Sequence, residues 1–209
     1  MGKNLDPKCK QCRRAGEKLF LKGERCYTAK CAIVKRNYPP GFHGPKGKKR
    51  LTDYGSQLNE KQKARRQYNL LEKQFKLIFE KARAKKGNTG DNFLELLERR
   101  FDNVIYRLGW ASSRSQARQM INHGLFTIND RKVNIPSYTV KTGDVIKIKS
   151  NKKQAKIFNG LSEKLKKHEV PGWLNMDAKE LTAKVLHKPD IAALKPNFDV
   201  QMIIEYYSR

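Results

Sequence analysis

The sequence predicts an α+β fold: a mostly helical first domain, an inserted module with a helix-turn-helix and a small antiparallel sheet, and an irregular N-terminal arm. Apolar residues recur at helical spacing through the middle of the chain, and their period shifts toward two after Gly124. The first 50 residues hold all four cysteines and 15 Lys and Arg against 3 Asp and Glu. We therefore expect an arm over 1–45, a helical domain over 46–95 plus 176–209, and the inserted module over 96–175.

The net charge of the chain indicates which class of molecule it binds. The chain has 209 residues and a formal net charge of +26, and such a charge destabilises a compact state unless a polyanion neutralises it. Nucleic acid is therefore the expected partner. No apolar run approaches the ~20 residues that span a bilayer, so we expect a cytoplasmic protein that binds no membrane.

Four cysteines are the main feature of the arm. The pattern C-x2-C followed by C-x4-C resembles structural zinc sites and predicts a structural Zn²⁺, although four thiolates would also accept an iron–sulfur cluster. Disulfides would need an oxidising compartment, and a redox pair would follow a strand that is missing here. The expected ligands are Cys9, Cys12, Cys26 and Cys31.

Three long runs predict helices, over 57–68, 70–86 and 91–108, with Gly109 as the C-terminal cap of the third. Ser113 is the expected N-cap of a short helix over 114–122, because Gln116 follows three residues later. The predicted strands cover 126–129, 132–135, 145–148 and 202–204, and a basic helical stretch covers 154–167.

The short helix over 114–122 divides its side chains between two sides. Ala117, Met120 and Ile121 are expected to pack, whereas Arg114 and Arg118 are expected to reach outward, where a forked guanidinium matches phosphate oxygens. The whole set of predicted RNA contacts is Arg13, Arg14, Lys48, Lys49, Arg50, Arg65, Arg66, Arg114, Arg118, His123 and Lys132.

The chain resembles the small-ribosomal-subunit protein four family of bacteria. The resembling segments of the module are 97–109, 113–121, 123–124, 127–129, 132–138 and 143–144, and those outside it are 21–26, 38–41, 72–75 and 205–209. Asn129-Asp130 departs from the Asn-Gly that is common in the hairpin of this family, so we expect Asp130 to adopt a left-handed conformation. The cysteines resemble those of the metal-bearing members.

The resemblance implies a structural protein without catalysis that binds the five-prime domain of small-subunit ribosomal RNA and nucleates subunit assembly. It also implies a contribution to translational accuracy near the messenger RNA entry path. The implied neighbours are messenger RNA and other small-subunit proteins, with protein five among them, and a stand-alone homo-oligomer is not expected.

Two other functions are weighed against this one. RNA-modifying enzymes carry a similar module, and Arg100-Phe101-Asp102 superficially resembles a catalytic motif, but Asp102 lies inside a predicted helix, which favours an ion-pair or capping role. A regulator that binds messenger RNA is compatible with the first function. Sequence-specific DNA binding is disfavoured, because no dimerising heptads accompany the short helix.

Overall fold

A computed structural model describes residues 4–47, 50–149, 156–158, 160–165, 168–178 and 180–209. Contacts divide the chain into two compact units, one formed by Met1–Phe93 with Lys195–Arg209 and the other by Leu94–Leu194. The helical first part and the small antiparallel sheet agree with the predicted mixed fold. The predicted boundary between 175 and 176 falls inside a strand of the sheet, Leu174–Asp177.

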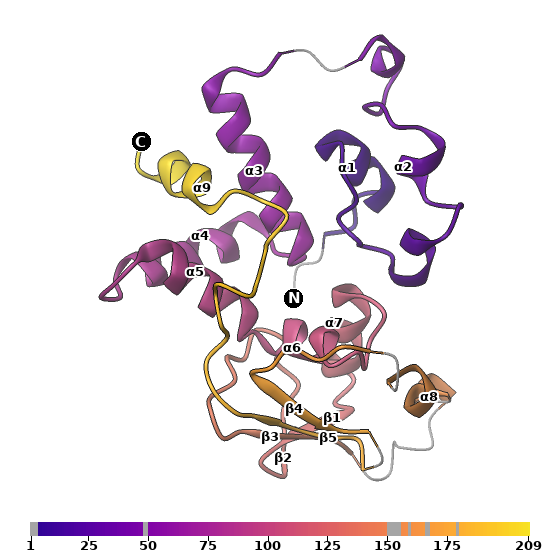
Figure 1. The fold of residues 1–209 in the computed structure, drawn as a ribbon, viewed down its shortest axis with the longest axis vertical. Coiled ribbons are helices and arrows are strands. Elements are labelled where there is room, and N and C mark those ends of the chain that lie inside the picture. Colours follow the sequence, from indigo (N-terminus) through magenta and orange to yellow (C-terminus); the bar gives the residue numbers. More distant parts are fainter. Residues whose placement is uncertain (1–3, 48–49, 150–155, 159, 166–167, 179) are drawn as a thin grey trace. The chain divides into compact units, whose positions relative to one another are not determined.

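Helices make up the first unit (Figure 1). In chain order they are α1 (Lys8–Ala15), the short turns η1 (Gly23–Tyr27) and η2 (Gly44–Lys46) on either side of α2 (Ala32–Lys35), then α3 (Asp53–Gln67), α4 (Glu72–Arg83), the start of α5 (Thr89–Glu98), and α9 (Val200–Tyr207). The helices predicted over 57–68 and 70–86 are confirmed by α3 and α4.

Aromatic rings fill the space between α4, α5 and α9. Phe75 and Phe79 of α4 meet Phe93 of α5 edge to face at centroid distances of 5.2 and 5.8 Å, and Tyr207 of α9 stacks on Phe79 at 4.6 Å. Burial of these rings contributes to the driving force for closing this unit. The C-terminal helix thereby becomes part of the core.

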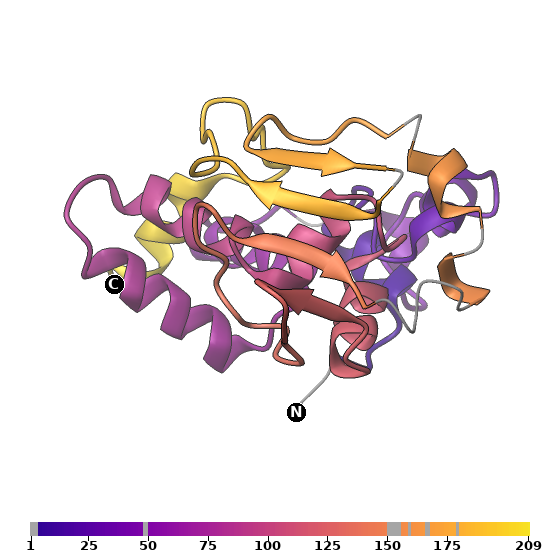
Figure 2. The same cartoon turned by 90° about the horizontal axis from the view of Figure 1, so that it is seen from below.

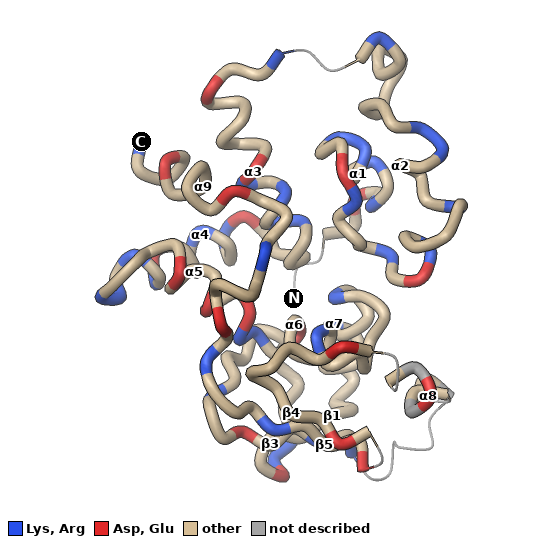
Figure 3. The backbone as a smooth tube through the Cα atoms, in the orientation of Figure 1, with Lys and Arg blue, Asp and Glu red and all other residues tan. Residues whose placement is uncertain are grey.

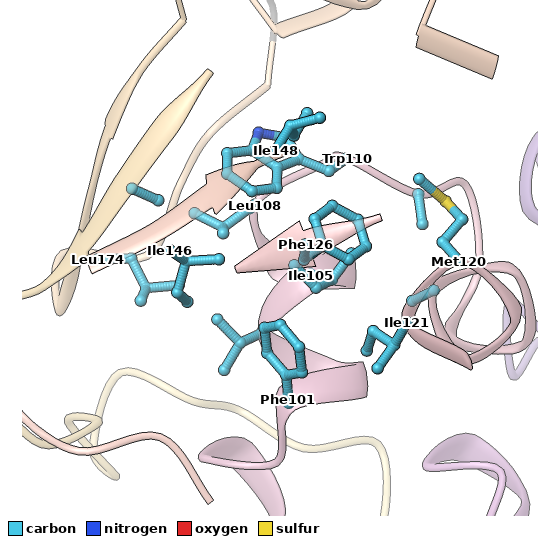
Figure 4. Close-up of a cluster of buried hydrophobic side chains, with 14 of the residues drawn as sticks. Phe101, Ile105, Leu108, Trp110, Met120, Ile121, Phe126, Ile146, Ile148 and Leu174 are labelled. Atoms are coloured by element: carbon cyan, nitrogen blue, oxygen red, sulfur yellow. The ribbon is translucent and has the colours of Figure 1, made fainter. Parts of the chain in front are cut away.

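A five-stranded antiparallel sheet and the helices packed around it form the second unit. Its strands lie side by side in the order β2-β1-β3-β5-β4 (Figure 2), and α6 (Phe101–Arg107) and α7 (Arg114–Asn122) pack against one face. The strands are β1 (Phe126–Ile128), β2 (Arg131–Lys132), β3 (Val145–Ile148), β4 (Leu174–Asp177) and β5 (Thr182–Val185), with η4 (Lys156–Phe158) and α8 (Leu161–Leu165) between β3 and β4. Figure 4 shows Phe101 and Ile105 of α6 facing Phe126 and Ile146 of the sheet.

Several predicted elements differ from the structure. The helix predicted over 91–108 is two helices, because Arg100 is extended and forms a bridge with Thr139. The strand predicted over 202–204 is wrong, since these residues belong to α9. Of the strand predicted over 132–135, only Lys132 lies in a strand, β2 (Arg131–Lys132). The sequence did not predict β4 and β5.

The helix predicted over 154–167 is replaced in part by η4 and α8. Residues 154–155, 159 and 166–167 of that prediction lie outside the described residues. The strand predicted over 145–148 is confirmed by β3.

Candidate nucleic-acid interface

The helix pair of the second unit is fixed by its caps. The Ser113 hydroxyl accepts a hydrogen bond from the backbone N–H of Gln116 at 3.3 Å, which confirms the predicted N-cap of α7. Gly109 and Gly124 follow α6 and α7 with φ of 73° and 65°, the left-handed geometry that favours glycine. Both ends of the turn between the helices are therefore set by local sequence.

A buried ionic network holds α6 to α7. Asp102 lies between Arg100, which donates two hydrogen bonds to it at 2.9 and 3.1 Å, and Arg118, whose Nε is 3.7 Å from a carboxylate oxygen. Asn103 accepts a hydrogen bond from Arg114 at 2.8 Å and donates to the Glu98 carboxylate at 2.9 Å. The Arg118–Asp102 ion pair and the Arg114–Asn103 hydrogen bond cross from α7 to α6, so they fix the helix-helix geometry.

Arg114 and Arg118 are 7% and 3% exposed, which differs from the outward orientation that the sequence predicts. Arg114 also stacks on the Tyr106 ring at 4.5 Å. Burial lowers the pKa of the Arg118 guanidinium, while Asp102 acts in the opposite direction. Arginines four residues apart on a helix can lie on its exposed face or on its buried face. Here the Asp102 carboxylate stabilises them on the buried face.

The C-terminal end of α7 presents polar groups to solvent. His123 is exposed at the helix end, and Lys132 is exposed on the neighbouring strand β2. The Lys132 side chain passes close over Gly124, where the Cβ of any larger residue would be only 2.5 Å from the Lys132 Cε. The structure thus brings His123 and Lys132 close together. Arg131, which precedes Lys132 on β2 and is also exposed, is a basic residue that the prediction missed.

The hairpin joining β1 to β2 has the predicted backbone. Asn129 and Asp130 both have positive φ, 49° and 62°, so Asp130 adopts the left-handed conformation expected from its place in the turn. Lys147 on β3 pairs with Asp130 at 2.8 Å, and the Asn129 amide donates to Asp144 at 2.9 Å. These contacts hold the turn against the sheet.

The arm contributes a second basic region, where Figure 3 shows Lys and Arg along α1, α2 and the loops around them. Arg13 donates to the carbonyl oxygens of Tyr38 and Pro39 at 3.0 and 3.1 Å and lies over the Tyr38 ring. It therefore holds the following loop to α1. Arg14 and Arg50 are exposed.

Arg65 and Arg66 lie at the end of α3, near α1. Arg65 is 3.4 Å from Glu72, and the Nε atoms of both arginines are buried without a hydrogen-bond partner among the described residues. Burial lowers the pKa of Arg66, and the charges of Arg65 and Arg14 lower it further, while Asp6 and Cys12 act the other way. Two of the predicted contacts, Arg65 and Arg66, therefore lie next to each other at the end of α3. Lys48 and Lys49 lie outside the described residues.

The prediction of a structural metal at the four cysteines is wrong. All four are free thiols that line one pocket with Leu21 and Ile33, yet no group of three or more His, Cys, Asp or Glu side chains in the described ranges can hold a metal ion. Burial raises the pKa of the Cys12 thiol. Sequence spacing alone does not report this environment. Neither zinc nor an iron–sulfur cluster is supported at Cys9, Cys12, Cys26 and Cys31.

A capped helix pair on a small sheet, with basic groups at its rim and along a basic arm, defines a nucleic-acid-binding class of protein. Residues 3–98 match a family described as the ribosomal protein S4/S9 N-terminal domain, and residues 99–146 match the S4 domain. Every helix in the described part of the chain is too short or too polar to cross a membrane.

Relatives match the chain over all or nearly all of its length. A protein named small ribosomal subunit protein uS4 in Syntrophomonas wolfei is 50% identical over 100% of both chains. The proteins of that name in Pelotomaculum thermopropionicum and Clostridioides difficile are 51% identical over 96% of both chains and 49% identical over 100% of both. The chain belongs to the small ribosomal subunit protein uS4 family, which confirms the resemblance noted in its sequence.

Proposed function

We infer that this protein is a structural component of the small ribosomal subunit and binds the ribosomal RNA of that subunit directly. The observation that carries this inference is the identity of about half of all residues, over the full length, with proteins named for that subunit. The net charge of +26 supports the same function, because Lys and Arg side chains bind RNA by releasing counterions from its phosphates.

The proposed RNA contacts are the exposed residues Arg14, Arg50, His123 and Lys132 and the partly exposed Arg65 and Arg66, together with Lys48 and Lys49, which lie outside the described residues. Arg13, Arg114 and Arg118 have a different role, since their guanidinium groups are engaged inside the protein. We assign these three to positioning the surfaces that carry the others. Rigid presentation of charge favours one RNA shape over others, which is how structured RNA is recognised.

Finer aspects of the function rest on the family. We propose that the RNA target is the five-prime domain, that binding nucleates subunit assembly, and that the protein contributes to translational accuracy near the messenger RNA entry path. Messenger RNA and neighbouring subunit proteins, protein five among them, are the proposed partners, and the protein acts within the ribosome and not as a stand-alone homo-oligomer.

We also propose that the protein is not an enzyme. The acidic residue that resembles a catalytic one, Asp102, is 2% exposed and paired with Arg100 and Arg118. A carboxylate enclosed in this way has no access to a substrate. Its surroundings match a structural ion pair.

The test is binding of the purified protein to small-subunit ribosomal RNA, to messenger-like RNA of equal length and to duplex DNA across a salt series. We expect the ribosomal RNA to bind tighter by orders of magnitude, with an advantage that persists at high salt. Equal affinities that weaken together would mean that the charge acts only as a nonspecific attraction.

A further inference from the structure

The loop between α2 and α3 carries a phenylalanine ring that the protein itself hardly covers. Phe42 is 91% exposed, whereas Phe75 and Phe93 of the same unit are fully buried. Among the described residues, its one aromatic neighbour is the adjacent His43, at 5.3 Å between ring centroids and nearly perpendicular. A single exposed apolar side chain is common on protein surfaces, so the structure and charge of the loop decide whether this ring has a partner.

The loop is anchored on both sides of its exposed ring. Arg13 of α1 donates hydrogen bonds to two successive carbonyl oxygens at the start of the loop, at 3.0 and 3.1 Å. Gly44 on the other side is buried, and a Cβ there would collide with the carbonyl oxygen of Pro39. The Gly44 N–H also donates to the carbonyl oxygen of Gly41 at 3.1 Å, so Phe42 lies between two fixed positions. A ring held in this way loses little conformational freedom when it binds a partner.

The charge around the loop indicates the chemistry of that partner. Residues 25–52 contain no Asp or Glu, and Figure 3 shows Lys and Arg on α2 and along the chain that follows it. Arg36, Lys46 and Arg50 of this stretch are exposed. A partner that covers the ring must therefore offer a flat apolar face next to negative charge. The bases and phosphates of a single-stranded nucleic acid combine these two features.

We propose that Phe42 stacks on an unpaired base of the small-subunit ribosomal RNA. This assignment rests on the proposed function and names one contact of it. Unpaired bases of structured RNA stack on aromatic side chains, and any base can do so because every base has a π face. The exposed Lys and Arg side chains of the loop bind the phosphates on either side of that base, and the His43 ring limits how far the phenyl ring can turn.

Phe42→Leu and Phe42→Tyr test the stacking. Leucine keeps an apolar side chain but has no π face, so we expect affinity for small-subunit ribosomal RNA to fall about tenfold, the effect of losing one stacked base. Tyrosine keeps the π face, and its affinity should stay within about twofold of that of the unaltered protein. The slope of log affinity against log salt should be the same in all three proteins, because no phosphate contact is lost. The thermal midpoints of the free proteins should agree within about 2 °C, since an exposed side chain contributes little to stability.

Two further variants sharpen the test. Leu77→Ala is the control, because it removes apolar surface from a side chain of α4 that is 48% exposed, and its affinity should equal that of the unaltered protein. Phe42→Trp reports on the ring directly. Trp110 and Trp173 are 2% and 3% exposed, so acrylamide in the free protein should quench mainly the introduced indole. Ribosomal RNA should lower the fluorescence of this indole and protect it from acrylamide, because a stacked base covers it.

The stacking is overturned if Phe42→Leu binds the ribosomal RNA as tightly as the unaltered protein, or if Leu77→Ala loses as much affinity. It is also overturned if acrylamide reaches the introduced indole equally well with and without RNA, which would leave the ring for a contact with another protein. Each of these results leaves the proposed function intact, provided the unaltered protein prefers ribosomal RNA to messenger-like RNA and duplex DNA. Absence of that preference in the unaltered protein would instead remove the proposed function, and the stacking with it.

Discussion

Asp102 carries a negative charge that two positive charges enclose. Its carboxylate is buried between the guanidinium groups of Arg100 and Arg118, and both arginines are themselves buried. Replacing it by asparagine would leave two buried positive charges without the anion between them. We expect Asp102→Asn to lower the free energy of unfolding by about 3–5 kcal/mol, measured by urea denaturation.

Asp130→Asn is the control for this prediction, because it makes the same chemical change at an exposed ion pair with Lys147. Exposed pairs contribute about 0–1 kcal/mol, and asparagine tolerates the left-handed backbone at this turn. We expect a change below about 1 kcal/mol. Equal effects of the two substitutions would show that the buried network does not stabilise the helix pair.

At the scale of elements, the sequence predicted those helices and strands whose signals are local. The caps at Ser113 and Gly109 and the alternating strand over 145–148 are predicted correctly because adjacent residues determine them. The break at Arg100 was missed because its cause, the bridge to Thr139, is distant in sequence. A short apolar run such as 202–204 suits a strand or a helix equally, and the Asp199 cap, which accepts from two backbone N–H groups, decides for α9.

The same difference between local signals and distant causes applies to the candidate site. Sequence reasoning selected arginines by charge and spacing, but it could not tell exposed members from buried ones, since burial of Arg114 and Arg118 depends on Asn103 and Asp102 of another helix. The cysteine spacing predicted a metal for the same reason. Spacing describes the chain, whereas ligation depends on the final environment of each thiol.

The hydrogen bond from Tyr207 of α9 to Glu72 of α4 leads to a prediction about how stability depends on pH. Burial alone would raise the pKa of Glu72, but hydrogen bonds from Lys61 and from the Tyr207 hydroxyl, together with the charges of Lys61 and Arg65, lower it below its ordinary value of 4.5. A depressed pKa in the folded state means that the stabilisation is complete above about pH 4.5 and is lost as pH falls through the lower value. Acid should therefore weaken the contact of α9 with α4.

Urea denaturation of Glu72→Gln from pH 7 down to pH 3 measures this effect. The variant should be less stable than the unaltered protein at pH 7, and the difference should shrink as the pH falls below 4.5 and through the lower folded-state pKa of Glu72, where the carboxylate becomes protonated. Glu80→Gln, which removes an exposed carboxylate 4.0 Å from Lys76 on the same helix, is the control and should show little difference at any pH. A difference for Glu72→Gln that stays constant down to pH 3 would contradict the assignment.

At the scale of the whole molecule, a charge of +26 has opposite consequences for the free and the bound protein. Salt screens repulsion among the protein's own cations, so raising NaCl from about 50 to about 500 mM should raise the thermal midpoint of the free protein by about 2 °C or more. Salt also weakens RNA binding, so the extra stabilisation that ribosomal RNA gives should shrink over the same range. Thermal melts with and without RNA at each salt concentration measure both trends. A midpoint of the free protein that falls with salt would mean that attractive surface ion pairs outweigh self-repulsion, and the excess charge would then no longer indicate a protein that depends on a polyanion for its stability.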